Sequence, residues 1–283
     1  MADTFTVGGA KKPRWSVVRE HPSAAVSALF ILVLLVAGTV LPMPYDPRMP
    51  DPFATLVPPS AEHWFGTDSS GSDVFSRVIA AAQVDLGLAL GGTAVSLLVG
   101  VPLGLLVSSK GAWGERSVRA LDAFQAFPLL ILALALVSLS GNRMSMVIVA
   151  IALINVPRYM RLMRSEILAL RESRFIEAAY ATGSSRLRVM WRHLLPNSLG
   201  VILVQTSLTI ANAIVIIAAM SFVGVGATPP TPSWGSMIRA GAENMAFGQW
   251  WVAVFPGLFV FLCVLCFNRI ADALGDITSV RRN

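Results

Sequence analysis

Long stretches without a single charged residue decide what this chain can fold into. Residues 24–41 and 86–109 carry no charge, and residues 199–222 and 251–267 repeat the pattern. About 20 consecutive apolar residues cross the hydrocarbon core of a bilayer as a helix, which satisfies its own backbone hydrogen bonds there. We therefore expect an all-α integral membrane protein.

The amino-acid composition supports this expectation. Apolar residues make up 55% of the 283 positions and charged residues only 13%, whereas about a quarter of a soluble globular chain is charged. The net charge of +6 would also suit a nucleic-acid partner, but the basic residues flank apolar stretches, as topology signals of membrane proteins do. We expect membrane lipid around the chain and no nucleic acid as a partner.

The fourth apolar segment, residues 144–159, is the weakest candidate span, because Asn155 and Pro157 interrupt it. The distribution of basic residues decides whether it crosses the membrane. If it does, 18 of the 22 lysines and arginines lie on one side and four on the other. Because basic residues concentrate on the cytoplasmic side, we expect six transmembrane helices with both termini in the cytoplasm.

This topology divides the chain into three parts. Residues 1–23 form a cytoplasmic N-terminal segment, residues 24–270 a transmembrane permease domain, and residues 271–283 a cytoplasmic tail. The first apolar stretch is longer than the roughly 7–15 residues of a cleaved signal core, so we expect it to be retained as a span. Within the domain we expect external loops at about 42–80 and 223–249, a basic loop at 110–119 before a third span at 120–140, and a cytoplasmic loop at about 160–198.

The cytoplasmic loop contains a shaped element, residues 174–197. Residues 175–182 are rich in helix formers, and Gly183 breaks that helix. Ser184 or Ser185 can cap a second helix, which Pro196 is expected to end. Apolar residues recur in this second helix at helical spacing, so we expect one face to anchor against the ends of the membrane helices: Leu187, Met190, Trp191, Leu194 and Leu195.

The same element resembles a known family signature. Glu177-Ala178-Ala179, three residues, Gly183, nine residues and then His193-Leu194-Leu195-Pro196-Asn197 are similar to the EAA loop of bacterial ATP-binding-cassette (ABC) importer permeases, in the form of the second permease of dipeptide and oligopeptide systems. Residues 58–77, 221–235 and 268–276 also resemble that group, with departures at Ser72 and at residues 83–85. The alternative interpretation of the loop is an amphipathic helix lying on the lipid surface.

The resemblance implies a permease subunit of an ATP-driven importer in the bacterial inner (plasma) membrane, with peptides as substrates. It implies as partners a sister permease, two ATPase subunits or domains, and an extracytoplasmic substrate-binding protein. The residues implied in coupling to the ATPase are Glu177, Ala178, Ala179, Gly183, Leu187, Trp191, His193 and Pro196.

The chain lacks the Gly-Lys-Ser/Thr pattern of a phosphate-binding loop, so we expect ATP to be used by partner subunits. We also expect no enzymatic activity and no cofactor or metal bound by this chain. The rival function is an ion-coupled secondary transporter or channel that acts without an ATPase. Such carriers usually bury ionisable groups near the midplane, whereas Asp85 and Asp122 are expected at the edges of spans.

The fifth span carries three polar side chains on one helical face, Gln205, Thr209 and Asn212. Such a stripe either hydrogen-bonds to a neighbouring helix or lines a polar translocation path. The sequence leaves both interpretations open.

Three residues could bind a metal but have simpler explanations. His63 lies in the proline-rich external loop, where we expect it to form a hydrogen bond. Cys263 and Cys266 lie one turn apart in the sixth span without a neighbouring His or carboxylate, so we expect them to pack as small apolar residues.

Overall fold

The computed structural model describes residues 21–40, 42–108 and 112–280. Expectations for residues 1–20, Lys110 and the end of the tail therefore lie outside the described residues. The described part of the chain contains helices and no named β-strand, so the all-α expectation is confirmed there. The helices are α2 (Pro22–Val40), α3 (Val74–Leu106), α4 (Ala112–Gln125), α5 (Leu129–Leu139), α6 (Met144–Leu170), α7 (Arg174–Ala181), α8 (Arg186–Val189), η1 (Met190–Leu194), α9 (Leu195–Val223), α10 (Trp234–Asn244), η2 (Met245–Phe247) and α11 (Trp251–Val280).

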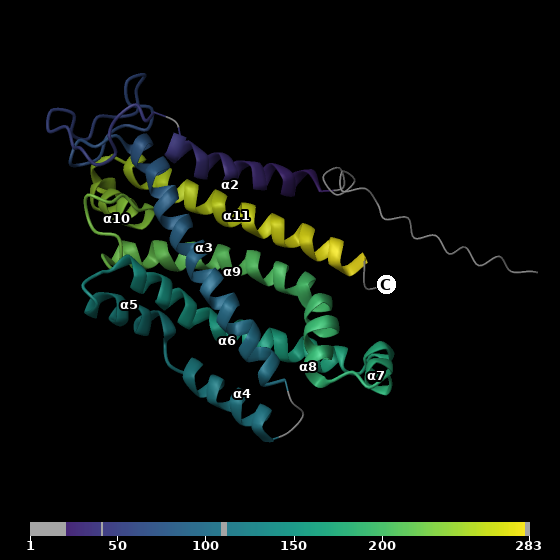
Figure 1. The fold of residues 1–283 in the computed structure, drawn as a ribbon. Coiled ribbons are helices and arrows are strands. Elements are labelled where there is room, and N and C mark those ends of the chain that lie inside the picture. The colour runs from purple at the N-terminus through teal and green to yellow at the C-terminus, as the bar shows by residue number, and fades with distance from the viewer. Residues whose placement is uncertain (1–20, 41, 109–111, 281–283) are drawn as a thin grey trace, which may run out of the picture.

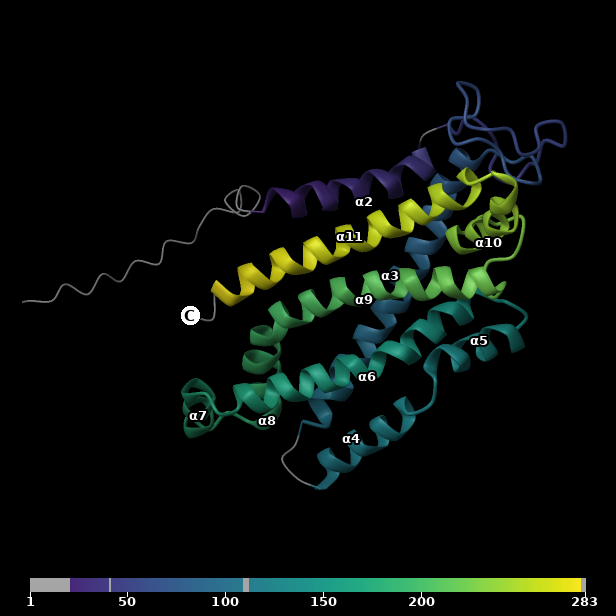
Figure 2. The same cartoon turned by 180° about the vertical axis from the view of Figure 1, so that it is seen from behind.

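The long helices run side by side in the order α2, α11, α9, α6, and α3 crosses them on one face, nearer the viewer in Figure 1 and behind them in Figure 2. The loop of residues 42–73 and α10 gather at one end of the bundle, while α7 and α8 lie at the other. An ion pair of 3.8 Å between His21 Nδ1 and Asp276 Oδ2 joins the start of α2 to the end of α11. Both ends of the described chain therefore lie beside each other.

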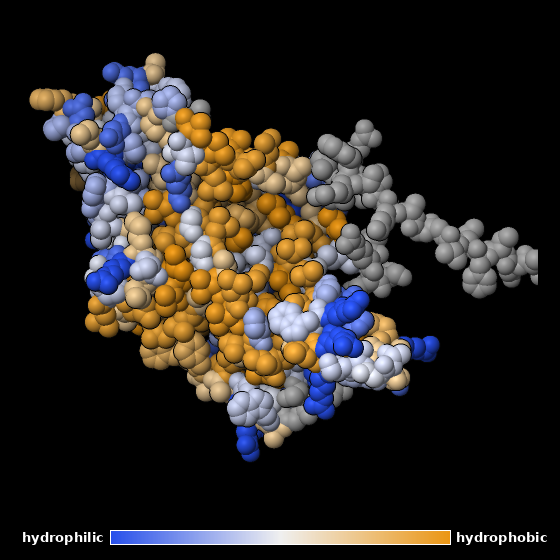
Figure 3. Space-filling view, viewed as in Figure 1, coloured by the Kyte–Doolittle hydropathy of each residue, from blue (hydrophilic) through white to orange (hydrophobic). Residues whose placement is uncertain are grey.

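Five of the helices are long and apolar enough to cross a membrane: Pro22–Val40, Val74–Leu106, Met144–Leu170, Arg186–Val223 and Trp251–Ser279. A sixth candidate is the pair α4 and α5, which is bent by 71°. Hydrophobic residues form a broad band across the face drawn in Figure 3, and hydrophilic residues gather at its two ends. An apolar band of this kind between polar ends suits a membrane-spanning bundle.

The third span differs most from its expected form. A span was expected over residues 120–140, with a loop before it, but α4 already begins at Ala112 and the helix breaks between Gln125 and Leu129. Pro128 explains the break, because it donates no backbone hydrogen bond and pushes Phe127 away from helical dihedral angles. The expectation of a loop up to residue 119 was therefore wrong.

Helix α3 begins earlier than expected and packs closely on α6. Asp73 caps it by accepting a hydrogen bond of 2.8 Å from the backbone N–H of Ser76, so α3 begins at Val74, within the stretch 42–80 expected as an external loop. A Cβ placed on Gly100 would lie 2.6 Å from Tyr159 Cβ. Gly100 therefore allows α3 and α6 to approach closely.

Two expected interruptions do not interrupt their helices. Asn155 and Pro157 both lie within α6, which continues to Leu170. Cooperative packing on α3 holds this helix together, because α6 has a buried face along most of its length. Pro196 lies in the first turn of α9 and does not end the preceding helix, since the first turn of a helix tolerates the missing N–H of proline.

Two buried cores hold the bundle. The larger one joins α2, α3, α5, α6, α9, α10 and α11 and includes Cys263 and Cys266, which are free thiols and pack there as expected. The smaller one lies where α3, α6 and α9 meet α7 and α8. Asp85, which was expected at the edge of a span, is buried within α3 with 1% of its surface exposed. A backbone N–H at the start of α10 compensates its burial.

Candidate coupling surface and transmembrane groove

Ile176 is the buried residue of helix α7. Ile176 is 1% exposed and packs in the smaller core with Met163 and Ile167 of α6. The neighbouring Glu177 and Ala178 are exposed and Ala179 is half-buried. The helix expected at residues 175–182 is confirmed with bounds shifted by one residue, and it presents Glu177 and Ala178 to solvent.

The corner after α7 depends on glycine. Gly183 has φ +80°, which favours glycine because a Cβ is strained there, although a Cβ would meet no atom within 4 Å. The backbone N–H groups of Gly183 and Ser184 donate to Tyr180 O and Ala179 O at 2.9 and 3.1 Å. Backbone conformation, not crowding, is therefore the reason for glycine at this corner.

The second helix runs directly into the membrane span. Of the two serines considered as its cap, Ser185 accepts a hydrogen bond of 3.4 Å from the backbone N–H of Arg188. The π-helical turn η1 follows, in which the N–H of Leu195 donates to Met190 O. The second helix is thus continuous with α9 through η1.

Only some of the residues expected to anchor this helix are buried against the bundle. Leu194 is 1% exposed and Val189 is fully buried, and both pack in the smaller core. Leu187 and Trp191 are 62% and 53% exposed, so the expectation that they pack on the membrane helices was wrong. The π turn explains the difference, because residues five apart lie on one face of it, so Leu194 is buried together with Val189 and is no longer aligned with Leu187 and Trp191.

Exposed apolar side chains therefore collect on α7, α8 and η1. We call this set, together with Glu177 and Ala178, the coupling surface. Its large apolar members are Phe175, Tyr180, Leu187 and Trp191. An exposed apolar patch of this kind on a helical corner is typical of a site that binds another protein.

A polar groove lies between α6, α9 and α11. Its cavity of about 400 Å³ is lined by Gln205 and Asn212 of α9, Arg158 of α6 and Asn268 of α11, among others. Thr209 is fully buried instead and lies within 3.2 Å of Gln205 Nε2, whose hydrogen bond it accepts. Gln205 and Asn212 therefore line a cavity, and Thr209 positions Gln205 through its hydrogen bond.

Arg158 and Asn268 were missed by sequence reasoning. Each lies on a different helix from Gln205, Thr209 and Asn212, so the spacing of residues along the fifth span could not predict that they line the same cavity. Arg158 and Gln205 also line a second cavity of about 520 Å³ with Arg161 and Arg164. The groove therefore adjoins a basic region along α6.

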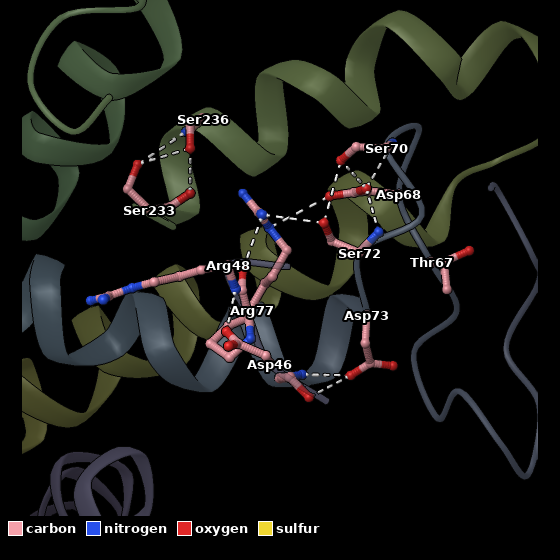
Figure 4. Close-up of polar contacts among 12 residues, drawn as sticks. Asp46, Arg48, Thr67, Asp68, Ser70, Ser72, Asp73, Arg77, Ser233 and Ser236 are labelled. Atoms are coloured by element: carbon pink, nitrogen blue, oxygen red, sulfur yellow. Dashed lines mark hydrogen bonds and ion pairs between the residues drawn. The ribbon is translucent and has the colours of Figure 1, made fainter. Parts of the chain in front are cut away.

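The loop of residues 42–73 is ordered by side-chain hydrogen bonds around Asp68. Asp68 Oδ1 accepts from the backbone N–H groups of Ser70 and Ser72 at 2.9 and 3.0 Å, as Figure 4 shows. Its other oxygen lies 3.5 Å from Arg77 Nε. The indole Nε1 of Trp251 donates to Thr67 O at 3.1 Å, which fixes the loop on α11.

His63 behaves as a hydrogen-bonding loop residue, as expected. Its Nδ1 lies 3.0 Å from Asp73 Oδ1, and its ring stacks near that of Tyr45 with centroids 4.6 Å apart. Loss of hydration, followed by the nearby carboxylates of Glu62, Asp73 and Asp51, raises the pKa of Tyr45 above its usual value. The phenol is therefore neutral in this loop at physiological pH.

The described residues form a bundle of apolar helices with an ordered loop at one end and an exposed helical corner at the other. A polar groove lies between the helices. Together these features define a membrane transport protein. The chain belongs to the family described as the binding-protein-dependent transport system inner membrane component, whose pattern matches residues 75–278. It is a multi-pass permease of the bacterial plasma membrane and a subunit of an ABC importer.

Several named proteins are similar in sequence to this chain over nearly its whole length. The dipeptide transport system permease protein DppC of Alkalihalophilus pseudofirmus is 39% identical over 97% of this chain and 91% of the relative. The glutathione transport system permease protein GsiD of Pectobacterium atrosepticum is 36% identical over 92% of this chain and 87% of the relative. GsiD of Escherichia coli O1:K1 is 38% identical, covering 93% and 88%.

A solved structure has the same fold. It is a chain of the MetNI methionine ABC transporter in inward-facing conformations, with a TM-score of 0.54 and 17% sequence identity. The similarity covers 70% of this chain and 95% of that one. The bundle described above is therefore an ABC permease fold.

Proposed function

We propose that the chain is the second of two permease subunits in an ATP-driven importer of dipeptides or similarly small peptides. Relatives named for dipeptide and for glutathione transport support this substrate class. The translocation path would run between this chain and a sister permease. An extracytoplasmic binding protein would deliver the solute to the end that carries the 42–73 loop and α10.

Six crossings with both termini in the cytoplasm are part of the proposal. The bent pair α4 and α5 would form the third crossing. The excess of 18 basic residues against four supports this orientation. The gathering of the 42–73 loop and α10 at the end of the bundle opposite α7 and α8 supports it as well.

The coupling surface would receive one of two ATPase subunits, which bind and hydrolyse the ATP, while this chain binds no cofactor. The observation that carries this role is the exposure of Leu187 and Trp191 on an element continuous with α9. Glu177, Ala178, Ala179, Gly183, His193 and Pro196 would shape the same docking element. ATPase closure would then move α8 and, through η1, the cytoplasmic end of α9.

Gln205 and Asn212 would line the translocation path, since both face the groove cavity. Thr209 would support Gln205 from inside the bundle. Rocking of the spans would open this groove alternately to the two sides of the membrane.

The test is a mild-detergent pull-down of the tagged chain from native membranes. Wild type would be compared with Glu177→Arg on the coupling surface and with Glu243→Arg, a matched charge reversal on α10 at the other end of the bundle. We expect the wild type and Glu243→Arg to retain an ATPase and Glu177→Arg to lose it. A wild-type chain that retains no ATPase would contradict the proposal and favour a secondary transporter.

A further inference from the structure

Arg158 lies in the interior of helix α6, toward the cytoplasmic end of its apolar stretch in the topology proposed above. It lies 14 residues after the start of α6 at Met144 and 12 residues before its end at Leu170, about 21 and about 18 Å from the two ends at 1.5 Å per residue. Helix α6 is one of the candidate spans. A guanidinium inside a helical bundle is costly unless it faces water or a partner of opposite charge.

No described carboxylate lies within ion-pair distance of Arg158 in the structured part of the chain. Its Nη1 donates instead to the neutral Oδ1 of Asn155 at 3.0 Å. Arg161, one turn along the same helix, differs, because its Nη1 lies 3.0 Å from Asp122 Oδ1. The charge of Arg158 is therefore not balanced by an ion pair in the described chain, whereas that of Arg161 is.

Asn155 holds the arginine in place. Its side chain is fully buried, and its Nδ2 donates to Ile151 O at 2.9 Å. The carbonyl oxygen of the same amide is thereby directed at the guanidinium of Arg158. Arg158 also lines the groove cavity.

The groove offers what a small polar solute needs. Its volume of about 400 Å³ lies in the range of small-molecule sites. Gln205, Asn212 and Asn268 supply amide donors and acceptors around Arg158, while Leu208 and Val215 supply apolar walls. The helices that form it, α6, α9 and α11, lie in front of α3 in Figure 2, on the face that α3 leaves uncovered.

We propose that Arg158 is a specificity-determining residue that binds the carboxylate of the transported solute inside the path. The proposal rests on the importer function above. A guanidinium binds a carboxylate through two parallel hydrogen bonds and keeps its charge at all physiological pH values. The terminal carboxylate of a peptide is ionised at neutral pH, so it provides the missing counter-ion while the amides of Gln205, Asn212 and Asn268 bind the peptide group.

The experiment measures ATP-dependent uptake into proteoliposomes that contain the complete transporter. The probes are alanyl-alanine and alanyl-alanine amide, each at a concentration that saturates the binding protein, so that selection occurs only in the permease. The variants are Arg158→Gln, Arg158→Lys and, as a matched control at the exposed start of the same helix, Arg143→Gln. Retention of the sister permease and of the ATPase is measured for each.

We expect Arg158→Gln to lower uptake of alanyl-alanine about tenfold relative to the amide, the factor produced by losing one charge-assisted interaction. The uptake ratio of Arg158→Lys should lie between those of Arg158→Gln and wild type, because lysine keeps the charge but cannot form two parallel hydrogen bonds to a carboxylate. Arg143→Gln should transport both probes as wild type does.

Two outcomes would overturn the proposal. If the ratio of alanyl-alanine uptake to alanyl-alanine amide uptake is equal in wild type and Arg158→Gln, the arginine does not bind the carboxylate. An equal fall for both probes together with loss of the sister permease would assign Arg158 to a carboxylate of that subunit. Failure of the importer function itself would look different, since wild type would then show no ATP-dependent uptake of either probe.

Discussion

Asp85 Oδ2 accepts a hydrogen bond of 2.8 Å from the backbone N–H of Trp234, across 149 positions of the sequence. The indole Nε1 of Trp234 donates in turn to Val78 O at 3.0 Å, and both side chains are buried. These two bonds fasten the N-terminus of α10 to α3. The connection between α9 and α11 is thereby fixed on the bundle rather than free to move as a loop.

Replacing Asp85 with alanine should lower the stability of the protein by about 1–3 kcal/mol, because a buried N–H would lose its acceptor. Asp85→Asn keeps an acceptor oxygen and should cost less. Thermal unfolding in detergent would measure both, with Asp122→Asn at an exposed carboxylate as the control. Wild-type stability of Asp85→Ala would contradict a role for this bond.

Gly183→Val should abolish or strongly reduce transport while the protein still reaches the membrane. The substitution forces a branched side chain into φ +80°, which costs about 1–2 kcal/mol and distorts the corner that presents the coupling surface. Gly141→Val is a close control, since Gly141 has φ +76° and equally open surroundings but lies in the α5–α6 turn. Uptake and membrane level would be measured for both, and equal uptake in the two variants would count against a coupling role for the corner.

Leu194→Ala should destabilise the chain by about 2–4 kcal/mol, because it leaves a cavity in the smaller core. Leu187→Ala and Trp191→Ala should leave stability within about 0.5 kcal/mol, since both side chains are exposed, but should weaken ATPase retention. Thermal unfolding and pull-down from detergent extracts separate the two effects. If Leu187→Ala loses stability but retains the ATPase normally, Leu187 belongs to the core and not to the coupling surface.

Gly100→Ala should destabilise the contact between α3 and α6 by about 1–3 kcal/mol, because the new methyl group would overlap Tyr159 Cβ at 2.6 Å. Gly87→Ala on the same helix is the matched control, since a Cβ there meets no atom within 4 Å. It should be neutral or slightly stabilising. The unfolding temperatures of the two variants in the same detergent would test the difference, and equal values would argue against close glycine packing.

Much of the fold was predictable from local properties of the sequence. Uncharged stretches predicted α2, α3, α9 and α11, because each must satisfy its backbone as a helix in lipid. The helix, glycine corner and capped second helix at residues 174–189 followed from propensity, φ requirements and the cap at Ser185. His63 as a hydrogen-bonding residue followed from its place in a polar loop.

Other features depend on contacts that the local sequence does not encode. The amphipathic spacing of residues 187–195 predicted an apolar face, but only the π turn and the position of α6 decide that Val189 and Leu194 are buried while Leu187 and Trp191 are exposed. Proline at 128 breaks its helix and proline at 157 does not. The same residue type has opposite outcomes because α6 is packed along α3 on its buried face, whereas α4 is mostly exposed.

The sequence alone determined that this chain is a helical membrane protein and where its helix, glycine corner and capped second helix lie, because hydropathy and turn chemistry act over a few neighbouring residues. Only the tertiary structure decided which distant side chains meet. Arg158, Gln205 and Asn268 come from three helices, and Asp85 meets Trp234 across most of the chain. Such meetings depend on how helices pack, and helix packing follows from the shapes of whole surfaces rather than from any single stretch.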